Sequence, residues 1–226
     1  MLSKSAPRSP YSDDRAKRQL ERLTTFSDGV IAVAITLLVL PLIDSLNQSA
    51  TEGGEKIIRE NIPMLIAFFF TFAIVALMWT LHNKVFGVLK RYDAKIFWLN
   101  ALFLALIALL PWVSALDIVP SEVGPNVSGW QPLASLVYWT TLGSVQLCLA
   151  LLAVYIIKHP ELLAHPKESL TNVNVTRGFS FTIVFYAIGV FSYVFADIGP
   201  YLPLILIPVG VIVGRWSSSY DRDKAK

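Results

Sequence analysis

Long apolar runs separated by short polar segments dominate this chain. A helix that crosses the hydrocarbon core of a bilayer, about 30 Å thick, needs roughly 20 mostly apolar residues. The run from Ala101 to Leu110 has no polar side chain at all. The pattern predicts an all-α membrane protein with six transmembrane helices: Phe26–Ile43, Ile62–Leu81, Ile96–Leu116, Leu133–Ile157, Phe179–Ala196 and Ile198–Trp216.

The sixth stretch is the least regular of these spans. Pro200, Pro203 and Pro208 interrupt it, and such prolines are tolerated in a membrane where neighbouring helices satisfy the freed backbone carbonyls. The segment from Asp197 to Pro200 is long enough only for a tight turn. The last two spans are therefore predicted to form a helical hairpin.

Lysine and arginine residues are distributed unevenly between the predicted loops. The N-terminal segment has six, the loop after the second span four, the loop after the fourth span three and the C-terminal end four, whereas the loops of the opposite side have two. The positive-inside rule places the basic side, with both termini, in the cytoplasm. The sequence thus predicts a disordered cytoplasmic tail over residues 1–18, a six-helix domain over 19–216 and a cytoplasmic tail over 217–226.

The composition excludes several functional classes. Of the 226 residues 54% are hydrophobic and 15% are charged, against about 25% charged in soluble domains. The single cysteine, Cys148, allows neither an internal disulfide nor a cysteine-based zinc cluster. No His-Glu-x-x-His or Gly-x-Ser-x-Gly motif is present. We therefore predict that the chain is not an enzyme and uses no metal or cofactor.

One face of the first span is apolar along its length. On a helix projected at about 100° per residue, Asp28 lies roughly 140° from Val33 and Ser27 roughly 120° from it on the other side, so both point into the protein. A stripe of this kind on a membrane helix ordinarily faces lipid or a neighbouring helix. The residues that share the face are Arg22, Phe26, Val33, Leu37 and Leu40, with Thr36 at its border.

The start of this span carries the residues by which the chain resembles a known family. Arg22, Phe26, Ser27 and Asp28 match the hallmark Arg-x-x-x-Phe-Ser-Asp of the transmembrane-protein-175 family. The animal members of that family are endosomal and lysosomal potassium channels, and the bacterial members are single-repeat relatives. The resemblance extends over most of the chain, including Trp79 and His82 at the end of the second span and Asn100 early in the third.

The resemblance implies a homotetrameric channel in which the first helix of each subunit lines the axis. Ordinary potassium channels use a Thr-Val-Gly-Tyr-Gly filter, which this sequence lacks. The matching constriction residues are Val33, Leu37 and Leu40, with Thr36 in a threonine layer. Val33 stands where relatives often have isoleucine or leucine, which implies a wider ring and modest selectivity for potassium over sodium. The expected location is the bacterial cell membrane, with permeant K⁺ and lipid, and without nucleic acid, as partners.

Four polar residues are expected at one depth in the inner leaflet. Asp28, His82, Asn83 and Asn100 all lie near the cytoplasmic ends of their spans. Buried polar groups in lipid need hydrogen-bond partners, and these four can supply them to one another. We therefore predict that Asp28 is structural, while His82 alone would be read as an ordinary interfacial residue.

Two other functions stay open at this stage. A secondary carrier is favoured by the proline-interrupted sixth span, because discontinuous helices are typical of carriers. A membrane scaffold that transports nothing is the third possibility. Small residues in the fourth and fifth spans, such as Gly143 and Gly189, are predicted to permit close helix packing.

Overall fold

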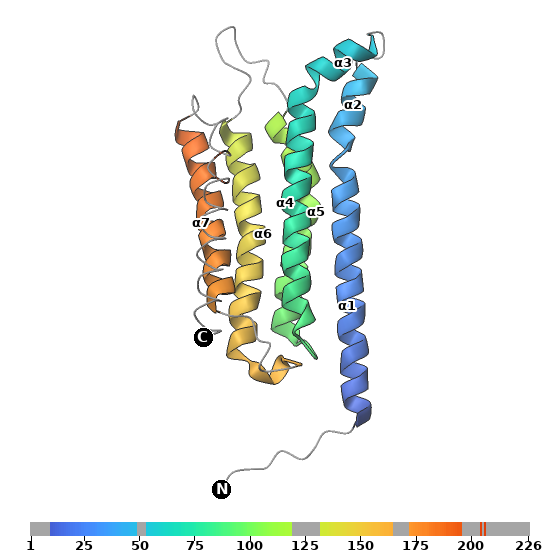
Figure 1. The fold of residues 1–226 in the computed structure, drawn as a ribbon, viewed down its shortest axis with the longest axis vertical. Helices are drawn as coiled ribbons and strands as arrows, with labels where there is room; N and C mark the ends of the chain where they lie inside the picture. The colour runs from blue at the N-terminus through green and yellow to red at the C-terminus, as the bar shows by residue number, and fades with distance from the viewer. Residues whose placement is uncertain are drawn as a thin grey trace, which may run out of the picture.

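The computed structural model describes residues 10–48, 53–118, 132–164 and 172–195, together with Leu204 and Leu206. Apart from those two residues, the predicted sixth span and the C-terminal tail lie outside this part of the chain. The described elements, drawn in Figure 1, are α1 Pro10–Leu37, α2 Leu40–Gln48, α3 Gly54–Glu60, α4 Ile62–Gly87, α5 Ala94–Ile118, α6 Pro132–Lys158, the short 3₁₀ helix η1 Pro160–Leu162 and α7 Asn172–Val194.

Five of the described helices are long and apolar enough to cross a bilayer. They contain or overlap the first five predicted spans, so the prediction of an all-α membrane protein is confirmed. The helix bounds differ at both ends of the first span. The structure begins α1 at Pro10, which places residues 10–18 of the predicted tail in a helix. Proline suits the first helical turn because its missing N–H would have no partner there, and Leu20 and Leu23 bury this helix against the bundle.

A break interrupts the first span at Leu38 and Val39, between α1 and α2. Pro41 explains it, because proline has no N–H to donate to the carbonyl four residues earlier and its ring clashes with that carbonyl. The Leu42 N–H bonds the Val39 carbonyl at 3.0 Å. Two backbone carbonyls, those of Leu37 and Leu38, are consequently left without a backbone donor among the described residues.

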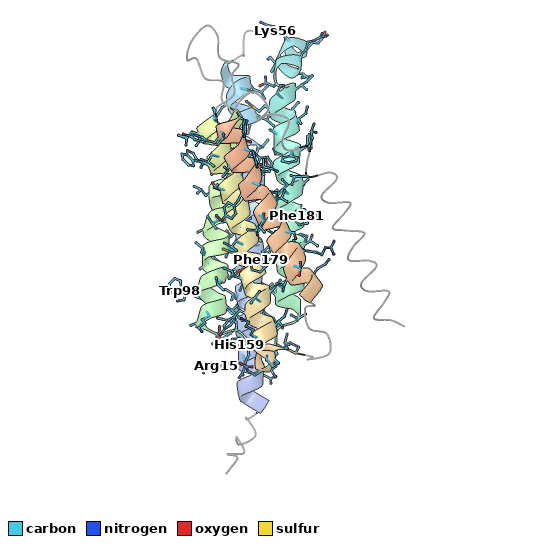
Figure 2. All side chains as sticks on the ribbon, turned by 90° about the vertical axis from the view of Figure 1, so that its left-hand side faces the viewer. Arg15, Lys56, Trp98, His159, Phe179 and Phe181 are labelled. Carbon is cyan, nitrogen blue, oxygen red and sulfur yellow. The ribbon has the colours of Figure 1, made fainter. Side chains whose placement is uncertain are left out.

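The helices stand side by side, with α1 at one edge of the bundle and α7 at the other (Figure 1). Helix α6 packs most extensively against α7 and α5, whereas α1 makes smaller contacts, mainly with α5 and also with α4. Figure 2 places Arg15 and His159 at one end of the bundle and Lys56 at the other. The segments with most of the lysines and arginines therefore share one end, as the alternation of predicted loops requires.

The connections at this basic end are tied together. An antiparallel bridge pairs Leu89 with Leu163, and the Lys90 N–H donates to the Leu162 carbonyl at 2.9 Å. The Tyr155 hydroxyl donates to Asp93 at 2.6 Å. Partial burial alone would raise the pKa of Asp93, but hydrogen bonds from the Ile96 N–H and from Tyr155 outweigh it and lower that pKa below its ordinary value.

Glycines allow the closest helix packing in the bundle, between α6 and α7. A Cβ at Gly189 would lie 3.1 Å from the Cβ of Trp139, and one at Gly143 would lie 3.2 Å from the Tyr186 ring. Both distances are tighter than ordinary van der Waals contact. Trp139 is buried in the core, and the Tyr186 hydroxyl lies 2.9 Å from Ser144 Oγ. The predicted packing role of these small residues agrees with this geometry.

We expect Gly189→Leu to separate α6 from α7 and to lower the free energy of unfolding by about 1–3 kcal/mol, as overpacking does in well-packed cores. The measurement is the thermal unfolding temperature of the detergent-solubilised chain. Gly87→Leu is the matched control, because no atom lies within 4 Å of a Cβ built there. Equal unfolding temperatures for the two variants would contradict the packing role of Gly189.

Candidate functional site

The apolar stripe of α1 points away from the rest of its own chain. Phe26 is 63% exposed, Val33 58%, Leu37 39% and, just beyond the break, Leu40 47%. Side chains this apolar are rarely left uncovered in such a continuous row, so the face meets either lipid or another protein chain. The position of α1 at the edge of the bundle (Figure 1) leaves room for both.

The opposite face of α1 is buried against the bundle. Ile31, Ala34 and Leu38 are almost completely covered, and they alternate with the exposed residues at helical spacing. The two faces therefore differ in surroundings but not in hydrophobicity. What orients the helix is its polar residues.

A shallow groove runs beside the stripe, between α1 and α5. Its volume is about 440 Å³, and Phe26, Val33 and Leu37 line it together with Ala108 of α5. Gly29 forms part of its wall, and no atom lies within 4 Å of the point that a Cβ at Gly29 would occupy. The uncovered apolar surface therefore extends from the face of α1 into the groove between α1 and α5.

Two polar residues accompany the apolar stripe, Arg22 at its basic end and Thr36 at its border. Arg22 is exposed one turn before Phe26, toward the basic end of the bundle. Thr36 is exposed and donates its hydroxyl hydrogen to the Val33 carbonyl at 2.7 Å. Leu37 and Leu38, whose carbonyls Pro41 leaves without backbone donors among the described residues, follow Thr36 in the sequence.

A buried chain of hydrogen bonds anchors α1 to α5 and α4. Asn100 Nδ2 donates to Ser27 Oγ at 2.9 Å, and His82 Nε2 lies 2.8 Å from Asn100 Oδ1. Ser27 and His82 are 0% exposed and Asn100 is 1% exposed. The rings of Phe86 and Phe103 stack on His82, with centroids 4.3 and 5.0 Å from it. The network is thus sealed by apolar side chains.

Asp28 lies beside this network and has another partner. Trp79 Nε1 donates to its Oδ1 at 2.8 Å, so a second hydrogen bond holds α1 to α4 one residue further along. The structure brings His82 and Asn100 together as the sequence suggested and places Asn83, half-buried, next to His82 on α4. Ser27 and Trp79 also take part, although they are not among the four polar residues expected at this depth. The position of Ser27 on the helix, turned away from the stripe, had indicated that its side chain is buried in the protein.

The described residues contain no group of three or more histidine, cysteine, aspartate or glutamate side chains that could hold a metal ion. The described site consists of an apolar surface on α1 and a buried hydrogen-bond network that fixes the orientation of this helix. Such a surface can exclude water or pack against copies of itself.

Comparison with known proteins identifies relatives of this chain. Residues 22–111, from the start of the stripe into α5, match the family model described as endosomal/lysosomal potassium channel TMEM175. The chain is 28% identical over 192 residues to a potassium channel of Chryseobacterium sp. (strain P1-3), an alignment that covers 82% of this chain and 90% of that one.

Two further relatives match over shorter segments. A potassium channel of Streptomyces collinus is 34% identical over 96 residues, which cover 42% of this chain and 46% of that protein. The endosomal/lysosomal proton channel TMEM175 of Danio rerio is 27% identical over 143 residues, covering 63% and 26%. Among solved structures, a lysosomal potassium-selective channel TMEM175 homolog from Chamaesiphon minutus shares the fold, with a TM-score of 0.66, 21% identity and coverage of 87% of this chain and 98% of that one.

We expect Asn100→Leu to destabilise the chain more than Asp28→Asn does, because it removes the partner of buried His82 Nε2 and the donor to buried Ser27, which keeps only its bond to the Leu23 carbonyl. Unpaired buried groups cost about 1–3 kcal/mol. Asp28→Asn is the matched comparison, since an amide oxygen can still accept from Trp79. The measurement is the temperature at which each purified variant loses its monodisperse chromatographic peak. An Asn100→Leu protein as stable as Asp28→Asn would refute the anchoring role.

Proposed function

This chain belongs to the TMEM175 family of potassium channels, and we propose that it conducts potassium through a pore lined by the exposed stripe of α1. Membership of an ion-channel family confirms that the chain is a multi-pass membrane protein and not an enzyme. The pore, its constriction and the number of subunits are the proposal. The expected location, the cell membrane of a bacterium, belongs to it as well.

The single observation that carries the proposal is the uncovered row formed by Val33, Leu37 and Leu40 on α1. A closed ring of identical subunits brings equivalent residues to equal distances from the symmetry axis. An axis that runs beside α1 therefore converts each residue of the row into a ring of aliphatic side chains. Four copies give the narrow conduit that the family resemblance implies.

An apolar row could instead face lipid, and the break at Pro41 argues against that alternative. Irregular backbone within a bilayer is tolerated where it is buried in protein or lines a water-filled cavity. The Leu37 and Leu38 carbonyls lack backbone donors within the described chain, and they lie within the predicted first span. In the proposed pore these carbonyls face the conduit, where water or a cation reaches them, whereas lipid would leave them without a partner.

The proposed constriction works by excluding water. Rings of branched hydrocarbon side chains dewet a narrow pore, so an ion passes only when the rings widen or when it sheds part of its hydration. Thr36 and the backbone oxygens around Leu37 offer partial replacement for the lost water. Val33 is smaller than Leu37 and Leu40, which places the tightest points at the two leucines and supports modest selectivity for potassium over sodium.

Arg22 lies at the basic end of the stripe and faces outward with it. A guanidinium there can reach the headgroup region while its stem covers apolar surface. We assign it the role of anchoring that end of α1 rather than attracting cations. Asp28, held by Trp79, is assigned a structural role.

We expect Val33→Cys, introduced with Cys148→Ser, to form an intersubunit disulfide under mild oxidation. A disulfide requires Cβ atoms about 3.5–4.5 Å apart, which only residues close to a shared axis satisfy. Ile66→Cys is the control, because Ile66 is 65% exposed but belongs to α4, which contributes no residue to the stripe. Gel mobility reports the disulfide and native mass spectrometry reports the number of chains.

The expected result is a mass of four chains and covalent dimers at Val33→Cys only. A mass of one or two chains would contradict the tetramer. Dimers at Ile66→Cys, with none at Val33→Cys, would place a different helix at the interface.

We expect Leu37→Ala or Leu40→Ala to raise the potassium flux into proteoliposomes and to reduce the preference for potassium over sodium, because smaller side chains widen and wet the rings. Ile66→Ala should leave both unchanged. Fluxes of potassium, sodium and protons are read in parallel, since the zebrafish relative is described as a proton channel.

The same assay separates the rival functions. Saturable exchange would support a secondary carrier, and no flux at all would support a scaffold. Unaltered flux and selectivity in both leucine variants would contradict the proposal that α1 forms the constriction.

A further inference from the structure

A second cavity opens between α4, α6 and α7, away from the stripe of α1. Its volume is about 390 Å³. Lys84, in the last turn of α4, and Arg177, near the start of α7, both line it. These positions place the two cations toward the same, basic end of the bundle, and Figure 2 shows Phe181 of α7, a further lining residue, above that end.

The chemistry of the cavity favours an anion. No aspartate or glutamate is among the described residues that line it, although two cationic side chains are. Gln146 of α6 contributes an amide to the wall while its side chain is only 5% exposed. That amide makes no hydrogen bond to another described residue, so it is available to a ligand in the cavity. A ligand with negatively charged acceptor oxygens suits the two cations and the amide that share this wall.

The local packing keeps this wall open. Gly178 of α7 also lines the cavity, and a Cβ there would lie 3.1 Å from Ala150 Cβ and 3.5 Å from Gln146 Nε2. The absence of a side chain lets α7 approach α6 without covering the amide. Beyond the polar groups the walls are apolar, formed by Leu77, Leu149 and Phe181.

We propose that this cavity binds an anionic phospholipid of the inner leaflet. Lys84 and Arg177 contact the phosphate, Gln146 donates to a headgroup or ester oxygen, and an acyl chain follows the apolar walls toward Leu77. Basic pockets between transmembrane helices on the cytoplasmic side have the properties that anionic headgroups require. A cation that merely marks topology needs no such cavity. Lys158, at the end of α6, is exposed as Lys84 is but does not line the cavity.

The test compares lipid binding by two charge-matched variants of the full chain. Lys84→Gln/Arg177→Gln removes both cations of the cavity, and Lys90→Gln/Lys158→Gln removes two exposed cations from the same end. Each protein is titrated in neutral detergent with dioleoyl phosphatidylglycerol, with dioleoyl phosphatidylcholine and with inorganic phosphate. Native mass spectrometry counts bound lipid, and the shift in unfolding temperature gives the apparent affinity.

The expected result is selective binding of phosphatidylglycerol by the parent chain and by the Lys90/Lys158 variant. The cavity variant should need at least about tenfold more lipid, because a basic residue near anionic lipid contributes about 1 kcal/mol and two are lost. Arg177→Lys, made in the parent chain, keeps the positive charge and should retain most of the parent's affinity for phosphatidylglycerol. It therefore separates loss of charge from misfolding caused by substitution at this position.

Four outcomes would overturn the proposal. Equal binding of phosphatidylcholine would show that the cavity does not recognise the phosphate charge. Full displacement of the lipid effect by inorganic phosphate would make the ligand a free anion. Equal loss in the Lys90/Lys158 variant would indicate general electrostatics, and a changed subunit mass in the cavity variant would make this face an interface between chains.

Discussion

The hydrogen bond between Asn100 of α5 and Ser27 of α1 determines which face α1 shows to its surroundings. Both faces of α1 are apolar, so hydrophobicity alone does not choose between them. A rotation that turned Ser27 outward would break its bond to Asn100 and, through Asn100, the partner of His82. Because unpaired polar groups are costly where no water reaches them, the network holds α1 in one rotational setting. The exposure of Val33, Leu37 and Leu40 follows from that setting.

The strength of packing divides the bundle into two parts. Helix α6 contacts both α5 and α7 extensively, and Gly143 and Gly189 bring α7 close to it. Helix α1 makes fewer contacts, and directional hydrogen bonds from Asn100 and Trp79 supplement them. Such an attachment fixes the orientation of α1 without burying most of its surface. This division suits the proposed assembly, in which the other face of α1 meets symmetry-related copies.

The sequence predicted the parts of this structure that depend on local patterns. The length of apolar runs located five spans, and helical periodicity separated Val33 and Leu37 from Ser27 on α1. The break at Leu38 was missed because a hydropathy window averages over Pro41, although the missing N–H of proline was a readable signal. The bond from Trp79 to Asp28 joins residues 51 positions apart and required the fold. The helix over residues 10–18 was hidden by a composition typical of tails.

What surrounds α1 cannot follow from a single chain, because lipid and a second copy of an apolar helix are nearly equal partners in hydrophobicity. The backbone supplies the asymmetry that hydrophobicity lacks. Pro41 releases the carbonyls of Leu37 and Leu38, the two residues that follow exposed Thr36 in the predicted first span. Against lipid these oxygens would be a pure cost. In the proposed pore they lie between the leucine rings. An ion that has lost water at a ring would there regain contacts with oxygen atoms. The same break that weakens α1 as a helix would thus lower the barrier for an ion in an apolar pore.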